Sequence, residues 1–200
     1  MASTATFNPL IIRETSSGIE RTDICDEMLR RRELIVAGDI ESGMAMSICQ
    51  LILHLEGEDP SSPITVYVSS PGGQVSAGLA IYDALRSVSC PVRTVCTELA
   101  ASMGSVIFMA GDEREMFPHA EIMIHDPLIP QGAGGSALAL QETSRRLMAR
   151  RRTLNGILAE RSGLTLRRVQ SLTAKDTYLN AERAVELGFA TRIISTRKEG

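Results

Sequence analysis

Short apolar runs typical of strands alternate with stretches of helical spacing through the first half of the chain. A compact aliphatic run at 34–36 predicts a strand, and apolar residues at intervals of three or four over 44–55 predict a helix. The same order then repeats: a strand at 64–68, a helix at 76–85, a strand at 92–96 and a helix at 102–110. This alternation predicts an α/β fold in which right-handed crossovers build a mostly parallel sheet.

The second half of the chain contains an irregular segment followed by a long helix. Residues 127–135 are rich in proline and glycine and predict a loop. Leu140, Leu147 and Leu154 then recur every seven residues, in a helix that we expect to end at Gly163. Such a narrow apolar stripe indicates packing against a neighbour. The other expected elements are strands at 122–125 and 190–194 and helices at 164–172 and 181–187.

The N-terminal residues differ in composition from the rest of the chain. Residues 1–20 are rich in serine, threonine and other small residues, with one apolar cluster at 10–12. We expect a flexible N-terminal arm there, with a short propeptide as a further interpretation. Neither a linker nor an internal repeat divides the remainder, so residues 21–200 are expected to form a single domain.

The composition is that of a soluble globular protein with an aliphatic core. Hydrophobic residues make up 44% of the 200 residues and charged residues 22%, whereas aromatic residues make up only 4% and tryptophan is absent. A net charge of −3 argues against a broad basic surface, so we interpret the arginines between 145 and 152 as a solvated helix face. No apolar run is long enough to cross a bilayer. We therefore expect a cytoplasmic protein that binds neither nucleic acid nor membrane.

The four cysteines indicate neither a disulfide framework nor a metal site. Cys25, Cys49, Cys90 and Cys96 show no Cys-x-x-Cys pair and no zinc-ligand spacing. Because nothing upstream resembles an export signal, we expect reduced thiols in a cytosol.

Two clusters of small residues lie where a predicted strand passes into a predicted helix, Ser-Ser-Pro-Gly-Gly at 69–73 and Ala-Ala-Ser-Met-Gly-Ser at 100–105. In a parallel sheet such turns share the edge at which ligands bind. The glycines leave backbone N–H groups accessible, and Ser102 opens a helix beside the positive end of its dipole. The clusters therefore predict an oxyanion hole and a serine nucleophile, with a tight turn and a close helix contact as the alternative.

A serine nucleophile requires a base, and the chain contains three histidines. His125 is the best candidate because it ends an apolar strand before the loop, whereas His54 lies within a predicted helix and His119 in a predicted turn. Asp126 is unsuited to orient His125, because consecutive residues of a strand point to opposite faces. Spacing leaves five other carboxylates open as the orienting group: Asp39, Asp59, Asp83, Asp112 and Asp176.

Six motifs in a fixed order connect these candidate residues to a known family. They are Ser-Pro-Gly-Gly at 70–73, Ala-Gly-Leu-Ala-Ile-Tyr-Asp at 77–83, Ala-Ala-Ser-Met-Gly at 100–104, Met-Ile-His at 123–125, Leu-Ala-Glu-Arg-Ser-Gly at 158–163 and Ala-Glu-Arg-Ala-Val-Glu-Leu-Gly at 181–188. From about Arg13 to Ile194 the chain resembles the ClpP family, the proteolytic subunits of the Clp protease. The resemblance implies a crotonase-like spiral of βαβ units with a protruding helix-plus-strand handle at about 126–160.

The resemblance also implies a serine endopeptidase that works through an acyl-enzyme. By position, Ser102 becomes the nucleophile, His125 the general base and Asp176 the carboxylate that orients His125. The N–H groups of Gly73 and Met103 become the oxyanion hole. No metal or organic cofactor is implied, because ATP is used by a partner ATPase.

The partners implied by the resemblance are further copies of the subunit and an ATPase. Family members form two stacked heptameric rings joined through the long helix, which gives the leucine stripe a purpose. AAA+ ATPases feed unfolded proteins into the ring chamber, where substrate binds as an added strand between the segments after Gly73 and Pro127.

Departures from the family pattern predict a divergent second ClpP that needs a sister ClpP subunit for full activity. Asp126 replaces the usual glutamine after the histidine, and we expect its charge to repel acidic substrates. Ala174 and Lys175 replace an acid and an arginine that pair between rings in many relatives. The ATPase-docking surface is depleted in aromatic residues, so we expect weak docking. Its aligned positions include Thr65, Tyr67, Ser87, Thr97, Phe117 and Ile194.

Two other functions are the alternatives to an active peptidase. A crotonase-type acyl-CoA hydratase or isomerase would share the oxyanion hole, but it places carboxylates at the reacting carbon, so Ser102 and His125 argue against it. The second alternative is a non-catalytic or partner-dependent ring subunit. The intact serine, histidine and aspartate argue for chemistry instead.

Overall fold

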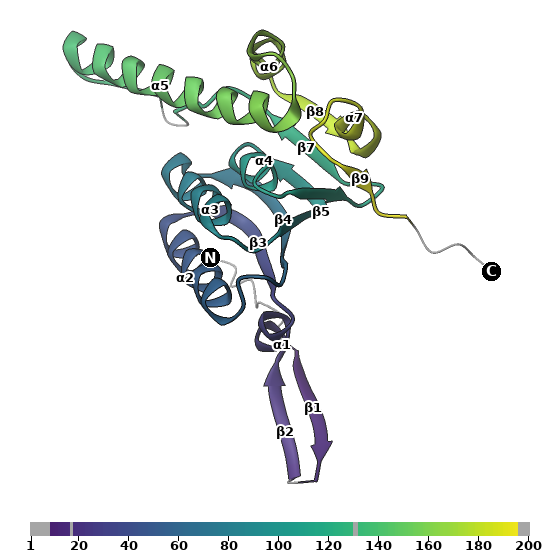
Figure 1. The fold of residues 1–200 in the computed structure, drawn as a ribbon. Coiled ribbons are helices and arrows are strands. Elements are labelled where there is room, and N and C mark those ends of the chain that lie inside the picture. Colours follow the sequence, from purple (N-terminus) through teal and green to yellow (C-terminus); the bar gives the residue numbers. More distant parts are fainter. Residues whose placement is uncertain (1–8, 17, 130–131, 196–200) are drawn as a thin grey trace.

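The computed structural model describes residues 9–16, 18–129 and 132–195, which form a parallel sheet with helices against it (Figure 1). The strands are β1 (Leu10–Thr15), β2 (Gly18–Asp23), β3 (Glu33–Ile40), β4 (Ile64–Gly73), β5 (Val92–Ala101), β6 (Glu113–Met116), β7 (Glu121–Ile124), β8 (Thr177–Asn180) and β9 (Arg192–Ile193). The helices are α1 (Ile24–Arg30), α2 (Ser42–Glu58), α3 (Val75–Ser87), α4 (Met103–Phe108), α5 (Ala137–Ser162), α6 (Leu166–Thr173) and α7 (Ala181–Glu186).

The main sheet has the order β3-β4-β5-β6-β9, with every neighbouring pair parallel. Strand β7 leaves this path, because it pairs in parallel with β5 and antiparallel with β8. Along β4 the side chains alternate, with Val66 and Val68 buried and Thr65 and Tyr67 partly exposed on the other face. The predicted α/β fold with a mostly parallel sheet is confirmed.

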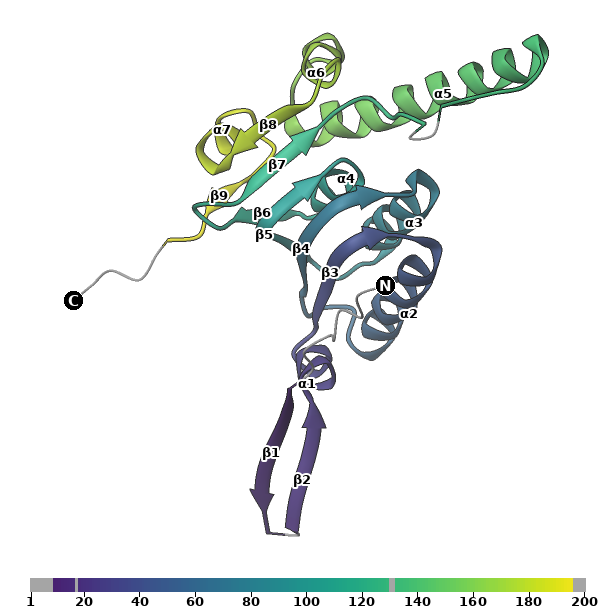
Figure 2. The ribbon, with the colours of Figure 1, turned by 180° about the vertical axis from the view of Figure 1, so that it is seen from behind.

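Helices α2, α3 and α4 cover one face of the sheet (Figures 1 and 2). Their buried positions are mainly aliphatic, as at Ile52 and Leu55 on α2 and Ile81 on α3. The predicted aliphatic core is therefore confirmed, with Phe108 and Phe189 as the largest fully buried side chains among the described residues. No helix in the described ranges is both long enough and apolar enough to cross a membrane.

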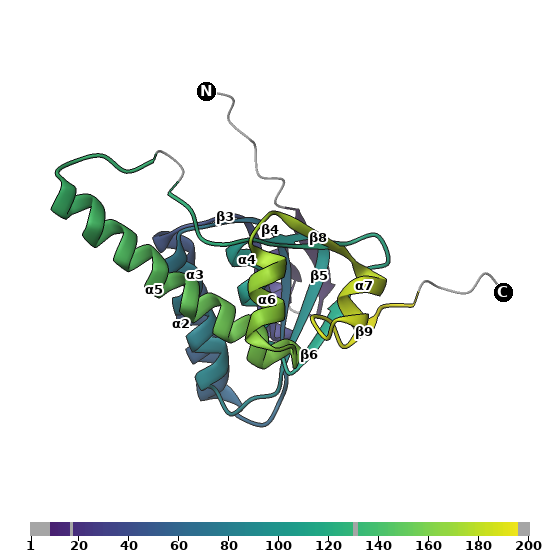
Figure 3. The same ribbon diagram turned by 90° about the horizontal axis from the view of Figure 1, so that it is seen from above.

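Helix α5 projects beyond the sheet and its helices (Figures 1 and 3). Ser136 caps its start by accepting a hydrogen bond from the N–H of Ala139, and Gly163 ends it with a φ of 76°, at the predicted position. In the leucine stripe, Leu154 is buried against the core whereas Leu140 is 40% exposed. The stripe thus contacts its own chain at one end and is open to a further partner at the other.

The segment between β7 and α5 differs from the expected handle. Its described residues, 125–129 and 132–136, contain no strand, so in these ranges the connection to α5 is irregular, and the expected strand of the handle is not found there. A strand requires a paired neighbour, and Pro127 has no N–H to donate to one.

The N-terminal arm expected over residues 1–20 is a β-hairpin where it is described. Strands β1 and β2 pair antiparallel from Leu10 with Asp23 to Thr15 with Gly18, and the hairpin extends away from the sheet (Figures 1 and 2). Most of its side chains are exposed; Thr22 is buried, and Ile11 and Asp23 are partly exposed. Without a buried face, the strands leave no alternating apolar pattern in the sequence.

Glu115 on β6 is a buried carboxylate held between two arginines. Its side chain is 1% exposed; Arg93 donates to one oxygen at 2.5 Å and Arg192 donates to the other at 2.7 Å. The hydrogen bond from Arg93 lowers the pKa of Glu115, burial opposes this effect, and the hydrogen bond from Arg192 lowers the pKa further.

Acid is therefore expected to destabilise the protein through Glu115. Because its folded-state pKa is lowered, Glu115 stabilises the fold above its unfolded pKa of about 4.3, and this contribution is lost as the pH falls through the folded value. We expect Glu115→Gln to flatten the pH dependence of urea unfolding below about pH 5. Glu113→Gln, at a 65% exposed side chain on the same strand, is the control. An unchanged pH dependence in Glu115→Gln would contradict the expectation.

Candidate active site

Ser102 lies at the turn between β5 and α4, in a backbone conformation that few residues adopt. Its φ of 52° is positive, as it is for one other non-glycine residue in the described chain. The turn is held because the Ser102 N–H donates to the Met123 carbonyl at 2.8 Å and the Ser102 carbonyl accepts from the Ser105 hydroxyl at 2.6 Å. A strained serine between a strand and a helix is typical of nucleophile turns.

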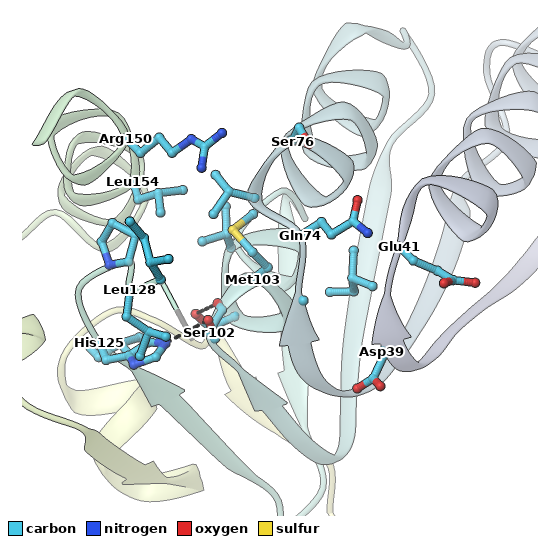
Figure 4. Close-up of a pocket in the computed structure, with 18 of the residues that line it drawn as sticks. Asp39, Glu41, Gln74, Ser76, Ser102, Met103, His125, Leu128, Arg150 and Leu154 are labelled. Carbon is cyan, nitrogen blue, oxygen red and sulfur yellow. Dashed lines mark hydrogen bonds between the residues drawn. The ribbon is translucent and has the colours of Figure 1, made fainter. Parts of the chain in front are cut away.

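His125 directly follows β7, and its side chain meets Ser102. Nε2 of His125 lies 2.8 Å from Oγ of Ser102, within hydrogen-bond distance (Figure 4). The His125 side chain is 15% exposed. The other histidines lie elsewhere, since His54 is beside Glu58 on α2 and His119 is in the turn before β7. The structure thus brings together the serine and the histidine that the sequence predicts.

Asp176 contacts the opposite nitrogen of His125. The antiparallel register pairs Ile124 of β7 with Thr177 of β8, which brings the flanking residues His125 and Asp176 opposite each other. Oδ1 of Asp176 lies 3.2 Å from Nδ1 of His125, and the Asp176 side chain is 63% exposed.

The other four candidate carboxylates have different surroundings. Asp59 accepts hydrogen bonds from the two serines of the turn after α2. Asp112 pairs with an arginine of α3 at 2.7 Å, and Asp83 is exposed on α3. Asp39 lines the same pocket as His125 but lies apart from it, on the β3 side (Figure 4). Of the five carboxylates that spacing left open, Asp176 is the one in contact with His125.

Two backbone N–H groups near Ser102 are candidates for an oxyanion hole. Met103 is the first residue of α4, so its N–H has no acceptor within the helix. Gly72 and Gly73 end β4 beside the same turn, and a Cβ on Gly72 would lie 2.7 Å from the Cβ of Ser102 and 3.2 Å from the Met103 nitrogen. A side chain at position 72 would therefore clash with the turn that carries Ser102.

Four of the five predicted site residues line one pocket of about 710 Å³: Gly73, Ser102, Met103 and His125. Asp176 lies outside that lining and contacts His125 from its other side. Three further charged residues line the pocket, Asp39 and Glu41 from the β3 side and Arg150 from α5 (Figure 4). In the sequence, Arg150 is visible only as one member of the arginine cluster at 145–152. The spacing of these arginines does not show which of them form ion pairs within the chain. Within the described ranges, no cluster of His, Cys, Asp and Glu is arranged to hold a metal ion.

Asp126 turns its carboxylate toward α5 and α6. It accepts hydrogen bonds from Arg151 Nε at 2.6 Å, the Thr173 hydroxyl at 2.8 Å and the Asn155 amide at 3.4 Å. Burial opposes ionisation, but these hydrogen bonds, led by that from Arg151, outweigh it and lower the pKa of Asp126. The negative charge of Asp126 is thus paired with Arg151 inside the chain. We therefore no longer expect Asp126 to repel acidic substrates.

One known protein family matches the part of the chain that contains the main sheet and all the candidate site residues. A family model described as Clp protease matches residues 16–197. The matched range begins inside the N-terminal hairpin and includes every element from β3 to β9.

Proposed function

The chain belongs to the Clp protease family, and we propose that it is a serine endopeptidase that hydrolyses unfolded proteins to short peptides. Its mixed α/β architecture with a parallel sheet is the crotonase-like fold of that family. One observation carries the proposal. Ser102, His125 and Asp176 are far apart in sequence, yet they make consecutive contacts of 2.8 Å and 3.2 Å beside a pocket.

The proposed reaction begins when Ser102 Oγ attacks the scissile carbonyl carbon and His125 Nε2 accepts the hydroxyl proton. The N–H groups of Gly73 and Met103 stabilise the resulting oxyanion. His125 donates its proton to the leaving amine as the C–N bond breaks. Water then attacks the acyl-enzyme with His125 again as base, which releases the new carboxylic acid and restores the Ser102 hydroxyl. Asp176 keeps a proton on Nδ1 of His125 and stabilises the imidazolium.

Gly73→Ala is expected to disable this machinery. The φ of Gly73 is 152°, and a Cβ there would clash with the Ile40 carbonyl oxygen, which already accepts a hydrogen bond from the Gln74 N–H at 2.8 Å. Displacing the Gly73 N–H should lower kcat/KM for a fluorogenic peptide by about 10²-fold or more, as removal of an oxyanion donor does. Gly57→Ala, at a position on α2 with open space around its Cβ, is the matched control. Wild-type kcat/KM in Gly73→Ala would contradict the proposed role.

We further propose that the subunit assembles in stacked heptameric rings and reaches full activity with a sister ClpP ring. Apolar side chains exposed along α5 support a further partner, since Leu138 is 77%, Leu140 40% and Met148 46% exposed. Ala174 and Lys175 replace the charges that pair between rings in many relatives. The contact between rings therefore depends more on the apolar face of α5.

We expect an AAA+ ATPase to dock weakly on this subunit alone, because the outer face of the sheet offers few exposed aromatic side chains. Tyr67 places its hydroxyl 3.4 Å from the Glu33 carboxylate, and Arg93 pairs with Glu115 on the same sheet. Among the aligned docking positions, Phe117 is an aromatic side chain left open, at 40% exposure. Docking sites normally depend on several buried aromatic anchors.

Peptide hydrolysis by the full chain, alone and mixed with a sister ClpP subunit, tests the proposed function. The sister subunit carries alanine at its own nucleophile, so all hydrolysis comes from this chain. We expect cleavage of a fluorogenic peptide and of an unfolded protein, faster in the mixture than alone. Absence of cleavage under both conditions would favour the non-catalytic alternative. Degradation by this chain and an ATPase at the rate of an ordinary ClpP would contradict its dependence on a sister ring.

The acyl-CoA alternative is disfavoured by the surroundings of Ser102. Carboxylates do line the pocket at Asp39 and Glu41, but they lie on the β3 side, whereas Ser102 is in contact with His125 (Figure 4). Tight binding of CoA in a calorimetric titration would revive that alternative.

A further inference from the structure

The pocket beside Ser102 carries opposite charges on its two sides. Asp39 and Glu41 line it from the end of β3 and the start of α2, whereas the Arg150 side chain extends from α5 toward the α3 side (Figure 4). Among the described residues that line the pocket, Arg150 is the one arginine or lysine. A peptide bound at Ser102 therefore meets positive charge on one side only.

Arg150 differs from Arg145, Arg146 and Arg151 on α5 in having no ion pair among the described residues, and it differs from Arg152, which also has none, in lining the pocket. Arg145 and Arg146 each pair with a glutamate of the same helix at 2.9 Å. Arg151 pairs with Asp126 at 2.6 Å. Arg151 has a carboxylate of its own, and Arg145 and Arg146 share Glu142. The charge of Arg150 has no such partner and is available to a ligand in the pocket.

Apolar side chains lie beside this charge. Leu154, one helical turn further along α5, is 6% exposed, and Met103 is 1% exposed; both line the pocket with Leu128. Such a wall accepts the aliphatic part of a substrate side chain, while a guanidinium binds a carboxylate through paired hydrogen bonds. Glutamate and aspartate combine these two features, whereas lysine and arginine would be repelled by Arg150.

We propose that Arg150 is a specificity residue that selects an acidic substrate side chain next to the scissile bond. The inference rests on the proposed peptidase function of this site. Asp39 and Glu41 disfavour acidic residues on the β3 side, so the acidic preference applies to one side of the scissile bond and not to both. Asp126 does not cancel it, because its carboxylate is already paired with Arg151.

Matched peptides with glutamate or glutamine on either side of the scissile bond test the inference. We expect wild type to prefer glutamate by about fivefold to tenfold in kcat/KM at one of the two positions, with the ratio falling as salt is added. Arg150→Gln should bring the ratio to about one without a comparable loss on the glutamine peptide. Arg152→Gln is the matched control, because Arg152 is exposed on the same helix and does not line the pocket.

Peptide binding to the full-length Ser102→Ala chain measures the same preference without chemistry. Fluorescence anisotropy should show tighter binding of the glutamate peptide, and the additional Arg150→Gln change should remove that difference. Equal affinities for the two peptides, undetectable binding of both, or a preference unchanged by Arg150→Gln would overturn the inference. A glutamate preference in binding with no hydrolysis by wild type would contradict the proposed function alone. Hydrolysis without any glutamate preference would contradict the inference alone.

Discussion

Replacing Ser102 with alanine is expected to lower kcat/KM for peptide hydrolysis by about 10⁴- to 10⁶-fold. In the proposed mechanism Ser102 forms the covalent bond to the substrate, and neither His125 nor the oxyanion donors can replace it. The contact of 2.8 Å between Ser102 Oγ and His125 Nε2 indicates that the pair acts as one unit. His125→Ala should therefore cause a loss of similar size, and the double variant should lose little more than either single variant.

The matched control for Ser102→Ala is Ser47→Ala. Ser47 is exposed on α2, and its hydroxyl donates to the Gly43 carbonyl of the same helix at 3.2 Å. It should retain wild-type kcat/KM. Steady-state assays of all variants, with the same sister ring and the same fluorogenic peptide, provide the comparison. A loss of less than about 10²-fold in Ser102→Ala would assign the hydrolysis to another group.

Arg114→Ala is expected to cause a large loss of stability. Arg114 is 8% exposed and donates to the carbonyls of Phe189 at 2.8 Å, Gly111 at 3.1 Å, and Arg161 and Gly188 at 3.2 Å each. It thus connects β6 to the end of α5 and to the turn after α7. Alanine would leave these carbonyls with fewer donors and would open a cavity. We expect a decrease of about 3–5 kcal/mol in the free energy of unfolding.

Denaturant unfolding of the full chain measures this loss. Arg167→Ala, at an exposed arginine of α6, is the control and should change stability by less than about 0.5 kcal/mol. If Arg114→Ala is too unstable to purify, Arg114→Lys keeps the charge with fewer donors and should lie between alanine and wild type. A change of less than about 1 kcal/mol in Arg114→Ala would show that the carbonyls find other donors.

Local patterns were sufficient to predict β3, β4 and β5 and the helices α2, α3 and α4 that alternate with them. The strand around Val66 and the helix around Ile81 are buried on one side, so their period is visible in the sequence. Gly73 and Ser102 could be singled out because they end a strand and begin a helix, where parallel sheets place ligands. His125 followed because few histidines are present.

Most features that could not be predicted from the sequence depend on contacts between residues far apart in the chain. Asp176 meets His125 only because β8 returns antiparallel to β7, and no local pattern encodes that register. Strand β6 is missed because it carries Arg114 and Glu115, which are buried through charged hydrogen bonds rather than apolar contacts. The resemblance to the ClpP family supplied the role of Asp176 that spacing did not.

Charged residues were the hardest to interpret from sequence. The arginine cluster on α5 was expected to be a solvated face, and four of its five arginines are exposed. The prediction did not identify Arg151 as the partner of Asp126 or Arg150 as part of the pocket lining. The expected repulsion of acidic substrates by Asp126 depended on its position beside His125 in the chain. Its side chain instead contacts α5 and α6, where its charge is neutralised.

Labelling with a serine-reactive fluorophosphonate, followed by mass spectrometry of the digested protein, tests the central claim most directly. The reagent forms a phosphonyl ester as the serine oxygen displaces fluoride, and it requires an activated serine rather than full proteolysis. We predict one modified residue, Ser102, in the chain alone or mixed with its sister ring, and loss of the modification in Ser102→Ala and in His125→Ala. Absence of labelling under every condition, or labelling that persists in Ser102→Ala, would contradict the assignment of Ser102 as the nucleophile.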